Sequence, residues 1–190
     1  METGDVLGLS GQPAADASVR PAGAADADAV GAVQSRAWRA QYADLVGAPA
    51  LADLTPQALA AAWHPALASP PSPRHAVLVA AAGSTVVGFV AVAPADDEGA
   101  DAADGEIVAL VVDPLHQRAG HGSRLLSAAA ATLRETGSLR VSVWVPVRDA
   151  ALRDFYLSAG LVVDGARRTL QGADGGRVQE QRLSAVLGDP

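Results

Sequence analysis

The stretch VDPLHQRAGHGSRLL, residues 112–126, decides the fold of this sequence. An apolar run over residues 106–112 predicts a buried strand, and a helical pattern over residues 121–136 follows it closely. The first amides of such a helix have no partners within the helix, and its N-terminus carries partial positive charge. Gly120 and Gly122 let these amides approach a ligand closely. The stretch therefore predicts a loop that binds phosphate or pyrophosphate. The alternative is a tight strand-to-helix turn with no ligand.

The remaining pattern surrounds this unit with short strands and helices. In chain order we expect a strand over residues 18–22, helices over 26–42 and 55–67, a hairpin over 76–93, the central strand, loop and helix, a strand over 139–147, a helix over 149–160, and strands over 161–164 and 177–187. Two strands joined by a helix are parallel neighbours with a right-handed crossover, so the sheet is mixed. We predict one α/β (α+β) domain with about four helices over residues 18–190, preceded by a flexible N-terminal tail over residues 1–17.

One apolar segment has the length of a membrane-spanning helix. It reads AVLVAAAGSTVVGFVAVAPA and covers residues 76–95. Its centre, Gly83-Ser84-Thr85, is a turn signal with β-branched residues on both sides. We therefore predict two short buried strands joined by a tight turn.

Composition argues against several functional classes. The net charge of −7 disfavours nucleic acid and anionic membrane surfaces as partners. The sequence has no cysteine, and its 4 histidines lack a metal-binding spacing, so we expect neither a thiol nucleophile nor a metal. The N-terminal residues have no basic start and no unbroken apolar stretch, which argues against a secretory signal. We expect a cytoplasmic protein with no nucleic-acid or membrane partner.

Residues 94–105, PADDEGADAADG, are acidic and have no apolar anchor. Such a segment is typical of a solvated connection between strands. The alternative is an electronegative rim that attracts cationic substrates.

Four motifs in this order resemble the GNAT superfamily of N-acyltransferases. QRAGHG at residues 117–122 matches [Q/R]-x-x-G-x-[G/A], the acyl-CoA pyrophosphate loop of the family. VDP at residues 112–114 resembles its V-x-P, and FYLSAGL at residues 155–161 resembles F-Y-x-x-x-G-F with leucine in the last place. AWRAQY at residues 37–42 resembles the A-W-R-x-x-Y of bacterial members. The resemblance covers roughly residues 18–187.

This resemblance implies a three-layer sandwich whose mixed central sheet is splayed between the fourth and fifth strands. Pro146 agrees with that splay, because a proline cannot donate to a ladder and marks where pairing stops. The co-substrate implied is acetyl-CoA, with no metal. The implied cofactor-binding residues are Leu110, Val111, Val112, Gln117, Arg118, Ala119, Gly120, His121, Gly122, Ser123 and Asp149. Two of them depart from the family: Arg118 replaces a common glycine, and Asp149 replaces a common asparagine that contacts CoA.

The resemblance also suggests two catalytic residues. Tyr156 is the expected general acid for the departing thiol, since a phenol pKa near ~10 is close to a thiol pKa of ~8.5. The alternative is a tyrosine that only packs in the core. Glu106 is the expected general base, directly or through a water, because partial burial raises a carboxyl pKa. The alternative is a solvated residue at a strand end. Other family members carry a glutamate on the next strand, where this chain has Trp144.

The first hypothesis for function is an acetyl-CoA-dependent N-acetyltransferase. It would transfer acetyl directly to a primary amine of a small molecule or peptide, because the absence of cysteine excludes a thiol acyl-enzyme. Trp38 and Tyr42 either line the acceptor pocket or pack in the core. A catalytically silent acyl-CoA-binding regulatory or sensor module of the same fold is the alternative, and a nucleotide-phosphate protein is a third. A homodimer is left open.

Overall fold

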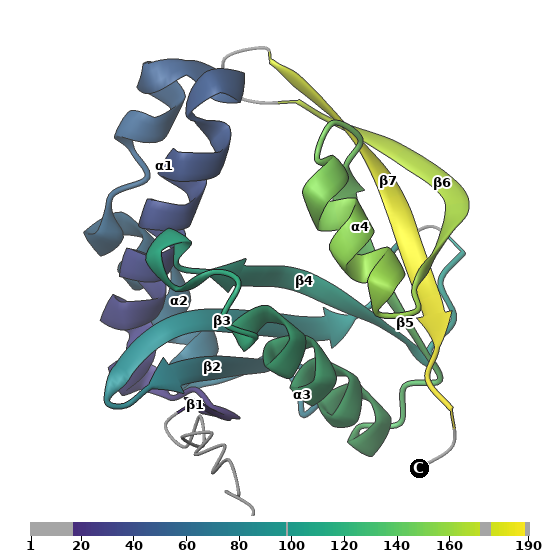
Figure 1. The fold of residues 1–190 in the computed structure, drawn as a ribbon. Coiled ribbons are helices and arrows are strands. Elements are labelled where there is room, and N and C mark those ends of the chain that lie inside the picture. Colours follow the sequence, from purple (N-terminus) through teal and green to yellow (C-terminus); the bar gives the residue numbers. More distant parts are fainter. Residues whose placement is uncertain (1–16, 98, 172–175, 189–190) are drawn as a thin grey trace, which may run out of the picture.

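The computed structural model describes residues 17–97, 99–171 and 176–188, with side chains for all of these except residues 17 and 42–51. Its strands and helices follow the predicted order (Figure 1). The elements are β1 (Ala17–Pro21), α1 (Ala27–Ala52), α2 (Pro56–Ala68), β2 (Ala76–Ala82), β3 (Thr85–Pro94), β4 (Asp104–Val112), α3 (His121–Glu135), β5 (Arg140–Pro146), α4 (Ala150–Ser158), β6 (Val162–Gln171) and β7 (Arg177–Val186), with 3-10 turns at Ala24–Asp26 and Pro114–His116. The predicted tail lies, apart from its last residue, outside the described residues.

The sheet is mixed, as the sequence predicts. Its strand order is β1-β2-β3-β4-β5-β7-β6, with β4 and β5 parallel and the other neighbours antiparallel. Pairing between β4 and β5 runs only from Asp104 opposite Arg140 to Ile107 opposite Val143. Beyond these residues the two strands diverge, so the predicted splay is confirmed. The interpretation of Pro146 is wrong, because β5 has left β4 three residues before it and Pro146 still pairs with β7 at Glu180.

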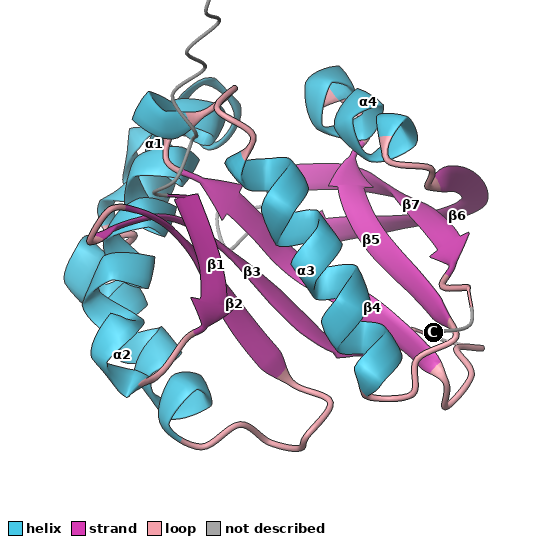
Figure 2. Cartoon of the chain, turned by 60° about the horizontal axis from the view of Figure 1, so that its bottom comes forward, coloured by secondary structure: helices cyan, strands magenta, loops and turns pink. Residues whose placement is uncertain are grey.

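Helices cover both faces of the sheet, which gives three layers (Figures 1 and 2). The predicted stripe of α3, Leu125, Ala129 and Leu133, is buried in a core that also contains Tyr156 of α4. A second core on the other face packs residues of α1 against β2, β3 and β4; its buried members are Val30, Val33, Ala37, Val79, Phe89 and Val111. The α1 side of the sheet therefore faces away from α3 and α4.

A β-bulge in β4 changes which side chains face which layer. Ala91 of β3 pairs with Ala109, and Val92 pairs with Ile107, so Val108 is an extra residue without a partner in the register. Ile107 belongs to the α3–α4 core, whereas Ala109 packs on the α1 side. Val108 is 57% exposed. The bulge therefore lies directly after the last residue of β4 that pairs with β5.

Two predicted boundaries are wrong. The first helix continues to Ala52 rather than ending near residue 42. The strand predicted over residues 161–164 is the ten-residue β6, because pairing with β7 resumes at Arg167 after a register shift. By contrast, the predicted hairpin is confirmed, with β2 and β3 joined at Gly83 and Ser84. Among the described residues, no helix has the length and apolar character needed to cross a membrane.

Candidate functional site

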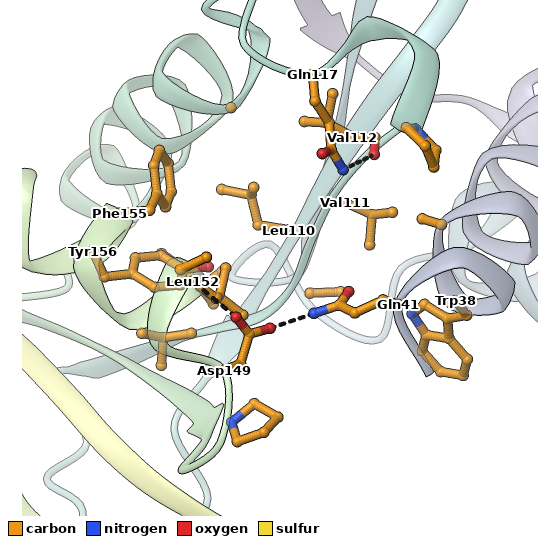
Figure 3. A pocket seen from close by; sticks show the side chains of 18 of the residues that line it. Trp38, Gln41, Leu110, Val111, Val112, Gln117, Asp149, Leu152, Phe155 and Tyr156 are labelled. Atoms are coloured by element: carbon orange, nitrogen blue, oxygen red, sulfur yellow. Dashed lines mark hydrogen bonds between the residues drawn. The ribbon is translucent and has the colours of Figure 1, made fainter. Parts of the chain in front are cut away.

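One large cavity lies where β4 and β5 separate. Its volume is about 840 Å³, and its walls come from α1, β4, the loop after β4, β5, β7 and α4. Figure 3 shows the side chains of α4 on one side, those of α1 on the other, and β4 between them. The predicted residues that line it are Trp38, Leu110, Val111, Val112, Gln117, Arg118, Gly120, Gly122, Ser123, Asp149 and Tyr156. Ala119, His121 and Glu106 do not line it, and the side chain of Tyr42 lies outside the described residues.

The loop at one end of the cavity presents the N-terminus of α3. Gly120 is its N-cap residue with φ of 80°, and no side chain caps the helix. Arg118 also has a positive φ of 64°, a conformation that a residue with a Cβ adopts at a cost. A Cβ at Gly122 would lie 3.6 Å from Phe155, so this position has ordinary van der Waals space. The helix N-terminus therefore offers backbone donors and partial positive charge to an anion.

Tyr156 lies at the α4 side of the cavity. Its side chain is 1% exposed, and its ring packs edge-on against Phe155 with centroids 5.1 Å apart. Burial raises the pKa of the Tyr156 phenol well above its ordinary value. The phenol is therefore protonated at neutral pH and can act as a hydrogen-bond donor.

Glu106 lies on the opposite face of the sheet, on the α1 side. It is 9% exposed, and its carboxylate makes no hydrogen bond or ion pair with any residue whose side chain the structure describes. Burial is the largest cause that raises the pKa of Glu106 to about 7, and the nearby charge of Asp97 adds to it, whereas Arg168 acts in the opposite sense. A carboxyl group with this pKa can accept a proton near neutral pH.

A hydrogen bond joins the two side walls of the cavity. Gln41 of α1 donates through Nε2 to Oδ2 of Asp149, as Figure 3 shows. The other carboxylate oxygen of Asp149 accepts from the backbone amide of Leu152 at 2.9 Å, and so caps α4. Asp149 therefore acts both as the predicted helix cap and as a contact to α1.

The acidic loop before β4 is partly anchored, which its sequence does not show. The indole Nε1 of Trp144 donates to Asp97 at 3.1 Å and 3.2 Å, and Arg182 forms an ion pair with the same carboxylate at 3.1 Å. Asp97 is therefore tied to β5 and β7 rather than solvated at a free rim.

The comparisons with known proteins agree with this geometry. The model of the acetyltransferase (GNAT) family matches residues 38–161. The chain belongs to the GNAT family. Among curated proteins, no sequence matches the chain significantly.

Solved GNAT structures share the fold over nearly their full length. The PaiA N-acetyltransferase of Thermoplasma acidophilum, in complex with coenzyme A, has a TM-score of 0.65 at 18% identity and covers 87% of this chain and 97% of its own. YncA of Salmonella typhimurium, with its cofactor acetyl-CoA, has a TM-score of 0.66 at 21% identity and covers 92% and 96%. The ribosomal-protein-S18-alanine N-acetyltransferase of Escherichia coli has a TM-score of 0.64 at 16% identity and covers 92% and 96%. At these identities the likeness concerns the fold.

The GNAT loop of this chain is held in place by an ion pair between a half-exposed arginine and a buried aspartate. Arg36 of α1 donates to Asp113 at 2.7 Å, and the amide of Leu115 donates to the other oxygen of Asp113 at 3.0 Å. Asp113 is 3% exposed. Burial alone would raise the pKa of Asp113, but these two donors hold it below its ordinary value. His121 is also buried, and this burial lowers the pKa of its imidazole.

The sequence did not reveal three residues at the far end of this GNAT cavity. Trp144 of β5 and Glu180 of β7 line it, as does the bulged Val108. Trp144 was considered only as the absence of a glutamate, and Glu180 lies outside every motif. Around Val108, residues 107–112 of β4 are all apolar and include no glycine that would have signalled a bulge. Only the register of β4, β5 and β7 brings these three together.

Proposed function

We propose that this GNAT protein is an acetyl-CoA-dependent N-acetyltransferase that transfers acetyl directly to a primary amine of a small molecule or peptide. One observation carries the proposal: the gap between β4 and β5 connects both faces of the sheet through a single cavity. The anion-binding loop and Tyr156 lie towards one face, and Trp144 and Glu180 lie towards the other. Two reactants can therefore enter from opposite sides and meet in the gap.

The residues at the loop fit the diphosphate of acetyl-CoA. The uncapped amides at the N-terminus of α3 suit an anion, and the left-handed backbone at Arg118 and Gly120 turns the chain around it. Under the proposal, the backbone over residues 118–123 holds the diphosphate, while Leu110, Val111 and Val112 flank the pantetheine arm. When bound, acetyl-CoA supplies an acetyl group activated as a thioester.

Glu106 would act as general base. The acceptor arrives as an ammonium ion and has no lone pair until it loses a proton. The Glu106 carboxylate, with a pKa of about 7, can take that proton. Because Glu106 does not line the cavity, a water in the cavity would carry the proton to it.

The backbone at the bulge and the Tyr156 phenol would stabilise the charges that develop. The new N–C bond forms as the C–S bond breaks, so negative charge passes through the carbonyl oxygen to sulfur. The amide of Val108 has no register partner in β3 and can donate to the oxygen. The attacking nitrogen loses a second proton as the amide forms, and this proton converts the departing thiolate to the free thiol. Tyr156 can donate a hydrogen bond to that sulfur. Its raised pKa favours donation over early proton transfer, which refines the simple general-acid role.

Thiol release from acetyl-CoA, measured with a panel of amines, tests the proposal. We expect turnover with at least one amine and thermal stabilisation by CoA that ATP or NAD does not give. CoA binding without turnover on a broad panel would instead favour the catalytically silent acyl-CoA-binding module. Stabilisation by ATP or NAD, and not by CoA, would overturn both functions.

A further inference from the structure

A cation of the protein itself packs against two side chains that line the α1 side of the cavity. Trp144, Arg168 and Glu180 form what we term the Trp144 corner. The guanidinium carbon of Arg168 lies 4.4 Å from the centroid of the Trp144 ring, and its Nε donates to Glu180 at 2.7 Å. Trp144 and Glu180 line the cavity, whereas Arg168 does not. An aromatic face beside a carboxylate can bind a cation. In this structure the guanidinium of Arg168 is the cation that contacts both groups.

The register places all of these residues on one face of the sheet. Arg168 pairs with Glu180 across β6 and β7, and Glu180 is two residues from Arg182, which pairs with Trp144 of β5. Because side chains alternate along a strand, residues two apart share a face. Val143 and Leu183, the sequence neighbours of Trp144 and Arg182, are buried in the α3–α4 core, so the corner faces the α1 side. It therefore lies opposite the side from which the cofactor loop approaches.

Negative charge is in excess on this face. Arg182 forms two ion pairs, from Nη1 to Asp97 at 3.1 Å and from Nε to Asp164 at 2.8 Å. One cation is therefore shared by two carboxylates. Arg168 serves Glu180. Glu106, 9% exposed on the same side, has no cation within ion-pair distance among the side chains that the structure describes. Two arginines therefore face four carboxylates, so the charge on this face favours a cationic ligand over an anionic one.

An acceptor carboxylate bound by Arg168 is the competing interpretation. The contacts of Arg168 argue against it, because its Nε is engaged by Glu180 and its planar face is covered by Trp144. A carboxylate placed there would also meet the charge of Glu180, which is 8% exposed. The repulsion would be weakly screened at such a site. The side chain of Arg168 is 37% exposed, so it can swing into solvent.

We propose that Trp144 and Glu180 form a subsite for a second, non-reacting cationic group of the acceptor, which Arg168 occupies in the free protein. The inference rests on the proposed acetyltransferase function and narrows its acceptor to amines that carry a further positive charge, such as alkyl diamines or guanidinoalkylamines. The reacting amine enters the gap near Glu106, the distal cation displaces Arg168 from Trp144, and Arg168 moves to solvent.

Three acceptors of equal chain length test the subsite. They are 1,4-diaminobutane, 1-aminobutane and 4-aminobutanoate, whose second group is positive, neutral or negative. We expect kcat/KM to fall in that order, by about tenfold at each step, as for a partly desolvated charged hydrogen bond with a cation–π contact. The opposite order, with 4-aminobutanoate best, would overturn the proposal and leave the acetyltransferase function standing.

Variants of the corner give effects of opposite sign. Glu180→Gln should remove the advantage of 1,4-diaminobutane over 1-aminobutane. Arg168→Gln should lower KM for the diamine, because it removes the internal competitor. Arg167→Gln changes the adjacent exposed arginine of β6 and serves as the matched control, with no change expected. A higher KM for the diamine in a folded Arg168→Gln protein would show that Arg168 itself binds the acceptor, and would overturn the proposal.

A binding measurement separates this inference from the proposed function. Calorimetry of 1,4-diaminobutane titrated into the protein saturated with CoA needs no turnover. Binding that Glu180→Gln weakens about tenfold supports the subsite even if no acetyl transfer occurs, whereas absence of turnover with all amines counts against the function alone. Equal affinity of wild type and Glu180→Gln for the diamine would contradict the subsite.

Discussion

The two halves of the cavity are built in different ways. Under the proposed function, the cofactor half consists of one continuous stretch, in which β4, the loop and α3 follow one another and offer backbone amides. Under the same proposal, the acceptor half consists of single side chains from β4, β5 and β7, which the register brings together, with Arg168 of β6 packed against them. Backbone amides do not depend on the identity of the side chains, as long as the turn is kept. Different members of a family can therefore share this half. The other half changes with each side-chain substitution, so under the proposed function it sets the choice of acceptor.

The largest expected effect tests the residue at the junction of the two halves. Tyr156→Phe should lower kcat about 1000-fold, within the range for a positioned proton donor, because only the hydroxyl is lost. The Kd for CoA should stay within about twofold of wild type, since the ring and its packing against Phe155 remain. Steady-state kinetics and calorimetry measure the two quantities. An unchanged kcat would mean that Tyr156 is a packing residue.

Glu106→Gln addresses the acceptor half. It should lower kcat/KM about 100-fold at pH 8, where the wild-type carboxylate is ionised and acts as base. Wild-type activity should rise through a pKa of about 7 as pH increases, and the variant should lose this limb. A pH profile of kcat/KM measures both. A variant that keeps the same limb would assign the base to another group.

The same variant has a predicted effect on stability. The pKa of Glu106 is raised from 4.5 in the unfolded chain to about 7 in the folded protein, so folding opposes its ionisation. Above pH 7 the ionised carboxylate lowers the free energy of unfolding by up to about 3 kcal/mol, and this loss disappears as pH falls to 4.5 and below. Glu106→Gln should therefore be more stable than wild type at pH 8 and equal to it near pH 4. Denaturant unfolding at both values checks this, and a less stable variant at pH 8 would contradict it.

A crossed pair of substitutions tests the cofactor loop. Arg118 and Gly120 both have positive φ, so Arg118→Gly should raise the free energy of unfolding by about 1 kcal/mol and Gly120→Ala should lower it by a similar amount. Arg118→Gly should also weaken CoA binding a few-fold if the guanidinium contacts a phosphate. Chemical denaturation and calorimetry give both values. Equal shifts in the same direction would show that backbone conformation does not decide the loop.

The smallest expected effect concerns the wall between the halves. Asp149→Asn keeps the cap of α4, because asparagine caps helices as well as aspartate does. It removes one negative charge from the cavity, so we expect CoA to bind up to about fivefold more tightly at low salt and the gain to shrink as salt is added. Calorimetry at two ionic strengths measures it. Weaker CoA binding in the variant would mean that the carboxylate itself contacts the ligand.

The strand, loop and helix of the cofactor half could be predicted from the sequence for a physical reason. A strand, a glycine-containing loop and a helix in succession leave a recognisable local pattern. The backbone is left-handed at Arg118 and Gly120, a conformation that glycine adopts without strain. The element order, the mixed sheet and the splay also followed from local patterns and the resemblance.

The acceptor half could not be predicted in the same way. Trp144, Arg168 and Glu180 are far apart in sequence, and they meet only because β5 pairs with β7 and β7 with β6 in one register. β6 was predicted too short, so Arg168 was not placed on a strand at all. The bulge at Val108 arises from pairing between β3 and β4, and a run of apolar residues does not encode it.

A crystal structure of the protein with acetyl-CoA tests the central claim most directly. The account predicts the diphosphate within hydrogen-bond distance of the backbone amides over residues 118–123, with the thioester in the gap between β4 and β5 near Val108 and Tyr156. A diphosphate bound elsewhere on the molecule, or a thioester pointing away from this gap, would contradict it.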